Sequence, residues 1–267
     1  MQYPVVGLFD ADLWCYDVAF AAQQKLEDGT EVILGFDYCK DFIDIRYEEI
    51  KHKLRFSKTE MYLTGSGNFR HDIATILPYK GNRKQPKPFH YENIRAYLQF
   101  KFNAEVVHGM EADDMLSIRQ CQLGDKSVII SRDKDLRMVP GWHYGYAVGK
   151  QPEQHLEHIS EYGYLHRNTK GKVIGGGMMW FYFQCLVGDT TDNIQGVPKC
   201  GPVKAFNALK DCETVKELHN ATLDIYKQHF GEGAGEAMLE NARLLWMVRE
   251  ATDSGDPVTL EEDWGVS

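Results

Sequence analysis

Two apolar runs that lead into aspartates most constrain the fold of this 267-residue chain. Residues 5–9, Val-Val-Gly-Leu-Phe, end at Asp10, and residues 127–130 lead into Ser-Arg-Asp-Lys-Asp at 131–135. Short, continuous apolar runs of this kind are typical of buried strands in a parallel sheet. Open α/β sheets carry their chemistry at the carboxyl ends of such strands, so we expect these acids to lie in a functional site.

Strand-like and helix-like segments alternate as far as residue 148. We expect further strands at 61–63, 104–107 and 142–148, and helices over 13–25, 39–54, 91–102 and from 111 onward. This alternation predicts an α/β fold with a mostly parallel central sheet flanked by helices. Residues 151–172 show no clear period, and Gly175-Gly176-Gly177 is interpreted as a flexible joint before a helical region. We therefore expect an α/β core over 1–175 and a helical C-terminal region over 176–267.

Acidic residues collect at four places that we expect to be strand ends or helix starts. These are Asp10; Glu111, Asp113 and Asp114; Asp133 and Asp135; and Asp189 and Asp192. A single group of this kind is more simply explained as N-terminal charge that favours the helix dipole. Four groups are harder to explain in that way, because clustered carboxylates repel one another unless they are protonated or bind metal. All-oxygen ligands favour Mg²⁺ or Mn²⁺ over zinc.

The stretch from 187 to 205 follows two of these acids with a glycine- and proline-bearing hairpin and an expected helix start. A backbone loop of phosphate size after two carboxylates indicates a metal beside a nucleic-acid backbone. The net charge of −9 opposes this interpretation, since phosphate contacts need cations. Between 79 and 101, however, six bases stand against the single acid Glu92. That run is either a solvated face or a phosphate-binding surface, and the sequence leaves both open.

No run of about 18 apolar residues predicts a membrane span, and the first residues show no secretory signal. We therefore expect a cytoplasmic protein.

The order of five motifs resembles that of the 5′-nuclease family, which includes flap endonucleases, the 5′-nuclease domains of bacterial DNA polymerases and phage-encoded 5′–3′ exonucleases. The motifs are Tyr79-Lys80-Gly81-Asn82-Arg83, Glu111-Ala112-Asp113-Asp114, the segment 131–136, the segment 188–194, and Gly196-Val197-Pro198. They correspond to the family's basic motif, two metal motifs, last metal motif and helix-hairpin-helix. The resemblance covers about residues 5–250 and implies a PIN-like core with a helix-hairpin-helix in the C-terminal part.

The resemblance also implies roles for individual residues. Asp10, Glu111, Asp113 and Asp114 would hold a first Mg²⁺, and Asp133, Asp135, Asp189 and Asp192 a second, with Mn²⁺ as a substitute. Lys80 and Arg83 would stabilise charge on the scissile phosphate. The implied DNA-binding residues are Arg70, Lys84, Gly196, Val197, Lys199, Gly201 and Lys204, with K⁺ associated with the hairpin.

The implied activity is two-metal hydrolysis of DNA phosphodiesters near a 5′ end, as a 5′–3′ exonuclease or flap endonuclease. The implied substrates are double-stranded or 5′-flapped DNA, with RNA in RNA–DNA hybrids as a second substrate. The implied setting is replication, primer removal or DNA degradation by a monomeric phage or bacterial enzyme. Asp189 and Asp192 would then complete the same active site as the α/β core.

Three positions depart from the family pattern. Thr64 stands where the family has an early aspartate, so one metal ligand is missing. Lys199 replaces a common glycine and Val203 a common lysine in the hairpin. Asp12 is an additional acid that we interpret as the N-terminal charge of a helix.

Two alternatives remain open. A non-catalytic DNA-binding relative would follow if the missing acid at Thr64 had disabled the chemistry. A haloacid-dehalogenase-type phosphatase would use Asp10 and Asp12 in an Asp-x-Asp motif, but Trp14 stands where that class has threonine or valine.

Overall fold

The computed structural model describes residues 4–261, which form two compact units, each assembled from separate segments. The first unit consists of the chain up to residue 67 together with 85–133 and 141–158. The second consists of 68–84, 134–140 and the chain from 159 onward. This division does not coincide with the expected boundary at 175/176, because three segments that precede it pack with the helical part.

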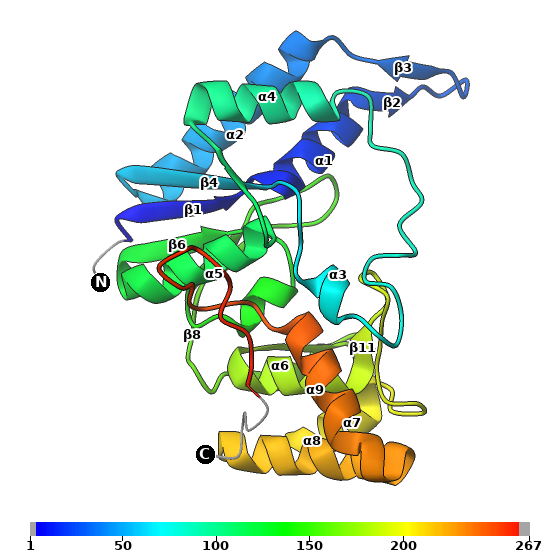
Figure 1. The fold of residues 1–267 in the computed structure, drawn as a ribbon. Coiled ribbons are helices and arrows are strands. Elements are labelled where there is room, and N and C mark those ends of the chain that lie inside the picture. The colour runs from blue at the N-terminus through cyan, green and yellow to red at the C-terminus, as the bar shows by residue number, and fades with distance from the viewer. Residues whose placement is uncertain (1–3, 262–267) are drawn as a thin grey trace. The chain divides into compact units, whose positions relative to one another are not determined.

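A six-stranded sheet forms the centre of the first unit (Figure 1). Its strand order is β5 (Glu105–Val107), β4 (Lys58–Thr64), β1 (Val6–Asp10), β6 (Ser127–Ile130), β7 (Gly141–Gly145) and β8 (Gln154–Ile159). β1 pairs in parallel with β4 and β6, and the pairs β4–β5 and β6–β7 are also parallel. The prediction of a mostly parallel central sheet is confirmed.

Helices cover both faces of this sheet (Figure 1). α1 (Ala11–Ala22), α2 (Phe36–Leu54) and α4 (Tyr91–Phe102) pack together on one side, and α5 (Ala112–Leu123) packs against β1, β4 and β6 on the other. The core between the sheet and the first group contains Phe9, Trp14, Met61 and Leu63. Every residue of β1 is buried, as its continuous apolar run predicts.

The helix expected over 13–25 ends earlier than predicted, at residue 22. Residues 23–25 instead form β2, which pairs antiparallel with β3 (Glu31–Ile33). These strands are exposed and polar, so they lack the alternating hydrophobic pattern by which strands are usually found.

The second unit is mainly helical and is built around α6 (Gly177–Val187). Ten of its eleven residues, 177–186, are buried, because α6 contacts α7 (Pro202–Leu209), α8 (Val215–Phe230) and α9 (Ala234–Leu245). A helix that is apolar on all sides is expected at such a central position. The smaller elements are α3 (Arg70–Ile73), the 3₁₀ turn η2 (Asp135–Met138), β11 (Gly188–Asp189) and β12 (Ile194–Gln195).

The interpretation of the glycines at 175–177 as a flexible joint is wrong. β9 (Tyr164–Arg167) and β10 (Val173–Gly176) pair antiparallel, and α6 begins at Gly177. Gly177 has a φ of +64°, and a Cβ at this position would lie 2.6 Å from the Cα of Gly163. The glycines are therefore required by close backbone packing and by a left-handed conformation.

Candidate active site

Asp10 is the most deeply buried carboxylate at the end of β1. Its Oδ1 accepts a hydrogen bond from the Leu13 amide (3.1 Å) and caps α1, and its Oδ2 accepts one from Ser131 Oγ (2.7 Å). Burial, assisted by the charges of Asp12 and Asp133, raises the pKa of Asp10 to about 7, although the hydrogen bonds oppose this shift. A cation bound at this carboxylate would favour its ionised form.

Asp10 provides a prediction about pH. Because its pKa is raised above the unfolded value near 3.9, the native state binds more protons than the unfolded state between about pH 4 and 7. The metal-free protein should therefore lose stability as pH rises through that window. The Asp10→Asn protein should not show this loss. The unfolding free energy of the variant minus that of the parent should therefore be more positive at pH 8 than at pH 5, by about 1 kcal/mol or more.

Denaturant unfolding in EDTA at the two pH values measures this difference. Asp211→Asn, at an exposed position, is the control and should show no such pH-dependent gain. A constant offset between the Asp10→Asn protein and the parent from pH 5 to pH 8 would contradict the prediction.

The acids at the start of α5 are used partly for capping. Asp114 is fully buried, and its Oδ2 accepts a hydrogen bond from the Glu111 amide at 3.1 Å. Glu111 is also buried, whereas Asp113 is half-buried. The interpretation of this group as helix N-terminal charge thus describes Asp114 well. Capping does not exclude a metal at Glu111 or Asp113, whose carboxylates contribute further negative charge here.

Thr64 and Asp12 interact at the carboxyl end of β4. The Thr64 amide donates to Asp12 Oδ2 (2.9 Å), and Thr64 Oγ1 accepts from the Ala112 amide (2.9 Å). Arg95 donates to Asp12 Oδ1 (3.3 Å) and to the Thr64 carbonyl (2.6 Å). Asp12 therefore ties the start of α1 to the end of β4, a role beyond the N-terminal charge expected from the sequence. Burial raises its pKa.

In the second unit, Asp135 and Asp189 share one cation. Lys134 Nζ lies 2.7 Å from Asp135 Oδ1 and 2.5 Å from Asp189 Oδ2. Asp189 Oδ1 also accepts from the Thr191 amide at 2.7 Å, and Gln184 donates to Asp135. Burial opposes ionisation of Asp189, but the Lys134 ammonium, the Thr191 amide and a hydrogen bond with Asp135 together lower the pKa of this carboxyl.

The basic motif folds onto the loop that carries Asp192. Tyr79 Oη donates to Asp192 Oδ2 (2.9 Å), Arg83 Nη2 lies 2.5 Å from Oδ1, and Lys80 Nζ lies 3.8 Å from Oδ2. The Lys80 amide donates to the Asp192 carbonyl at 2.9 Å, and Lys80 adopts a φ of +54°. The sequence motifs at 79–83 and 188–194 are therefore brought together in this unit.

The hairpin between α6 and α7 depends on a close backbone approach. A Cβ on Gly196 would lie 2.3 Å from the carbonyl carbon of Val187, so only glycine fits there. Lys199 has a φ of +60°, which explains why glycine suits its position, and its side chain is exposed. Gly201 and Lys204 are exposed as well. The Val197 amide, in contrast, donates to the Leu186 carbonyl, and its side chain is buried. The prediction that Val197 contacts DNA is wrong for this reason.

The prediction that Arg70 contacts DNA is also wrong. Its side chain is fully buried, with Nε donating to the Leu244 carbonyl (2.9 Å) and Nη2 to the Trp246 carbonyl (2.6 Å). The guanidinium also lies over the Phe69 ring. Arg70 therefore anchors the segment that follows α9 rather than a phosphate.

Arg70→Met is expected to destabilise the protein by about 2 kcal/mol or more, because two buried carbonyls lose their donor. Thermal unfolding measures this change, which should appear as a lowered Tm. The exposed Lys84→Met is the control and should leave the Tm unchanged. An Arg70→Met protein with the parental Tm would show that the buried guanidinium contributes nothing to folding.

No group of three or more His, Cys, Asp or Glu side chains is arranged to hold a metal ion within residues 4–261. The donor sets nevertheless fit Mg²⁺ or Mn²⁺, which prefer carboxylate oxygens. In the first unit, burial and neighbouring acids disfavour the ionised form of Asp10, and a cation would reverse that effect. In the second unit, the carboxylates of Asp135 and Asp189 already bind a cationic group.

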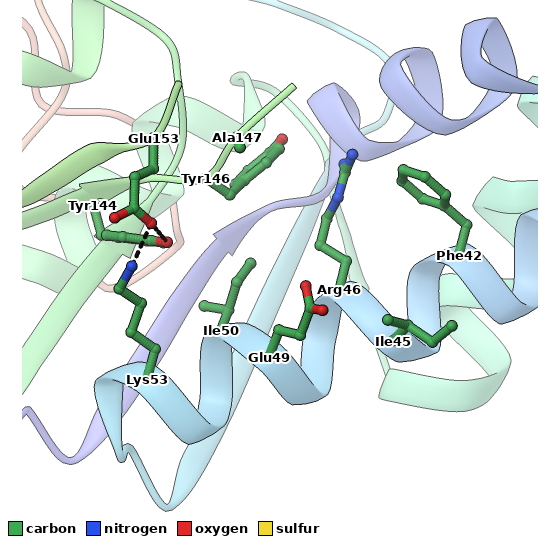
Figure 2. A pocket seen from close by; sticks show the side chains of 10 residues that line it. All are labelled: Phe42, Ile45, Arg46, Glu49, Ile50, Lys53, Tyr144, Tyr146, Ala147 and Glu153. Atoms are coloured by element: carbon green, nitrogen blue, oxygen red, sulfur yellow. Dashed lines mark hydrogen bonds and ion pairs between the residues drawn. The ribbon is translucent and has the colours of Figure 1, made fainter. Parts of the chain in front are cut away.

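A pocket with a volume of about 440 Å³ lies in the first unit, between α2 on one side and the end of β7 and the segment after it on the other (Figure 2). Its lining includes Arg46, Tyr144 and Tyr146, together with the ion pair between Lys53 and Glu153. The acidic and basic residues singled out from the sequence as site residues are not among those that line it. In the part of the chain that the structure describes, no helix has the length and apolarity needed to span a bilayer.

Comparison with known proteins bears on the family. No protein-family model matches the chain. It is 27% identical over 249 residues to DNA polymerase I of Bacillus caldotenax. This alignment covers 88% of the chain and 26% of that protein. It is 29% identical over 164 residues to a 5′–3′ exonuclease of Buchnera aphidicola, covering 57% of the chain and 52% of that protein. The chain is therefore similar to proteins named 5′–3′ exonuclease and DNA polymerase I.

The chain spans about a quarter and about half of the length of these two relatives. Solved structures with the same fold are also found. The flap endonuclease of bacteriophage T5, solved as a complex with DNA and metal ions, superposes with a TM-score of 0.60 at 15% identity. The match covers 90% of this chain and 88% of that structure.

Three residues of the site do not stand out in the sequence. Lys134 lies between Asp133 and Asp135, but the sequence does not reveal its role, because its ion-pair partner Asp189 is 55 residues away along the chain. Arg95 was seen only as part of a basic run, and Asp12 was interpreted as helix charge. The Asp-x-Asp spacing at 10 and 12 was the one signal that pointed to Asp12.

Proposed function

We propose that this chain is a metal-dependent 5′-nuclease that hydrolyses DNA phosphodiesters near a 5′ end. The observation that carries the proposal is the contact of Lys80 and Arg83 with Asp192 in the second unit. It brings two cations able to bind a phosphate next to a carboxylate of the kind that binds Mg²⁺. The relatives named as a 5′–3′ exonuclease and DNA polymerase I, and the T5 flap endonuclease with DNA and metal ions, support the same activity.

We assign the carboxylates to two Mg²⁺ ions. Asp10, Glu111, Asp113 and Asp114 hold the first ion, and Asp133, Asp135, Asp189 and Asp192 hold the second, with Mn²⁺ able to replace either. These residues would hold the ions, and bound ions would supply polarisation of the phosphate and a lowered pKa for the attacking water molecule. The protein's own contribution is to fix these carboxylates: Ser131 and the Leu13 amide orient Asp10, and the Thr191 amide orients Asp189.

Lys80 and Arg83 stabilise the negative charge that develops on the scissile phosphate. Lys84, Lys199 and Lys204 are exposed and contribute phosphate contacts that position the duplex without reading its sequence. The backbone at Gly196 and Gly201 forms part of the same hairpin, with K⁺ as its expected ion. The substrates proposed are double-stranded and 5′-flapped DNA, with RNA–DNA hybrids as a second class and replication or primer removal as the setting. We propose a monomer.

A DNA-binding relative without activity is the second candidate, and Thr64 is the observation that favours it. This residue carries a hydroxyl where the family has a carboxylate, and that hydroxyl is engaged by the Ala112 amide. The candidate predicts DNA binding without cleavage in either Mg²⁺ or Mn²⁺.

Cleavage of 5′-labelled and 3′-labelled blunt duplex, 5′-flap DNA and RNA–DNA hybrid distinguishes the two candidates. Products released from the 5′ end in Mg²⁺, and absent in EDTA and with Asp135→Asn, would establish the nuclease. Binding in both metals without products would establish the inactive relative. In that case Thr64→Asp is the first substitution to test for a gain of cleavage.

A further inference from the structure

Lys134 is a cation placed between two carboxylates that are largely removed from solvent. Its ammonium lies 2.7 Å from Asp135 Oδ1 and 2.5 Å from Asp189 Oδ2, and these side chains are only 15% and 3% exposed. Two such carboxylates would repel each other strongly without a shared positive charge. The lysine therefore supplies a positive charge that the two carboxylates share in the metal-free protein.

The two ends of Lys134 are held very differently. Its carbonyl accepts a hydrogen bond from Trp180 Nε1 at 2.8 Å, and Trp180 belongs to the buried face of α6. Its side chain, in contrast, is 47% exposed. The backbone is thus held by a buried side chain, whereas almost half of the Lys134 side chain is exposed to solvent.

We infer that Lys134 is a built-in counter-ion of the Asp135–Asp189 pair, which positions the pair before metal binds and competes with a divalent cation for it. The inference rests on the proposed function, in which these two carboxylates hold metal. A divalent ion must displace the Lys134 ammonium from the two carboxylates. Breaking this ion pair costs free energy, which makes the binding free energy of the metal less favourable. Lys134 acts through the two aspartates and is a positioning residue.

Lys134→Met tests both parts of this role, and Lys210→Met is its matched control. Lys210 pairs with Asp211 at 3.2 Å in the same unit, but its partner is 83% exposed. Both variants remove one positive charge. Mn²⁺ binding without DNA is measured from the electron paramagnetic resonance signal of the free ion, and metal-free stability from the Tm in EDTA.

We expect Lys134→Met to bind Mn²⁺ more tightly than the parent, by on the order of tenfold, and to have a lower Tm in EDTA. Lys210→Met should match the parent in both measurements. Lys134→Arg should restore the parental Mn²⁺ affinity and Tm. Lys134→Gln keeps a hydrogen-bond donor for the carboxylates, so it serves if the methionine protein fails to fold, and it too should bind Mn²⁺ more tightly.

Equal or weaker Mn²⁺ binding by the folded Lys134 variants would overturn the inference while leaving the proposed nuclease intact, provided that Asp189→Asn weakens Mn²⁺ binding. Absence of Mn²⁺ binding in parent and variants alike would overturn both. A tighter affinity in Lys210→Met as well would show that net charge, rather than the Asp135–Asp189 pair, controls the metal, and the inference would fall.

Discussion

Asp189→Asn is expected to lower the rate of DNA cleavage in Mg²⁺ by about 10²-fold or more, because Asp189 is a proposed metal ligand and such a ligand contributes several kcal/mol of transition-state stabilisation. Asparagine has the same shape, and its Oδ1 can still accept from the Thr191 amide, which now meets the carboxylate at 2.7 Å. The change removes the carboxylate charge and the acceptor of the Lys134 ammonium but keeps the contact with the Thr191 amide. Single-turnover cleavage of a 5′-flap substrate at saturating Mg²⁺ measures the loss.

Asp211→Asn is the control, since this carboxylate is exposed and pairs only at the surface with Lys210. It should retain the parental rate. Full activity of Asp189→Asn in Mg²⁺ would exclude Asp189 from the metal site. A loss that is rescued by Mn²⁺ would, in contrast, support the assignment, because a weakened site recovers more readily with a more tightly bound ion.

Lys80→Met is expected to reduce kcat by on the order of 10²-fold, with a much smaller change in DNA affinity. Lys80 Nζ lies 3.8 Å from Asp192 Oδ2, with its side chain 20% exposed, so it is positioned beside a proposed metal ligand rather than on the open surface. Rapid-quench cleavage gives kcat, and fluorescence anisotropy in Ca²⁺ gives the DNA dissociation constant.

Lys84→Met is the matched control, four residues along the same basic segment but fully on the surface. It should weaken binding, reduce the salt dependence of binding by about one phosphate contact, and leave kcat near the parental value. If Lys80→Met and Lys84→Met gave the same kinetics, the role of Lys80 in the transition state would be refuted.

The elements that sequence predicts best are those with a clear pattern. The strand at 127–130 and the helix at 91–102 are observed with the expected bounds, because the first ends in three β-branched apolar residues and the second has an amphipathic period. β8 and β9 were missed because their residues are mostly exposed or half-buried, so no alternation marks them. Their pairing is decided by tertiary context rather than by local preference.

The parts of the candidate site that belong to the linked motifs could be predicted from the sequence. The acidic groups and the basic motif can be recognised in the sequence. The contact of Tyr79, Lys80 and Arg83 with Asp192 agrees with the prediction that the basic motif and the last acidic motif act together. The burial of Arg70 did not follow, since its carbonyl partners lie more than 170 residues away. An arginine ahead of a basic motif resembles a phosphate ligand until those partners are known.

The assembly of the second unit from separate segments limits how this chain can be divided. A fragment that began at residue 176 would contain the hairpin and most of the helices but would lack 68–84 and 134–140. Asp192 would then lose Arg83, Asp189 would lose Lys134, and the carbonyls at the end of α9 would lose Arg70. The hairpin region is therefore unsuited to transfer into another protein as an independent DNA-binding module. A fragment-complementation experiment would have to supply the segments 68–84, 134–140 and 159 onward together.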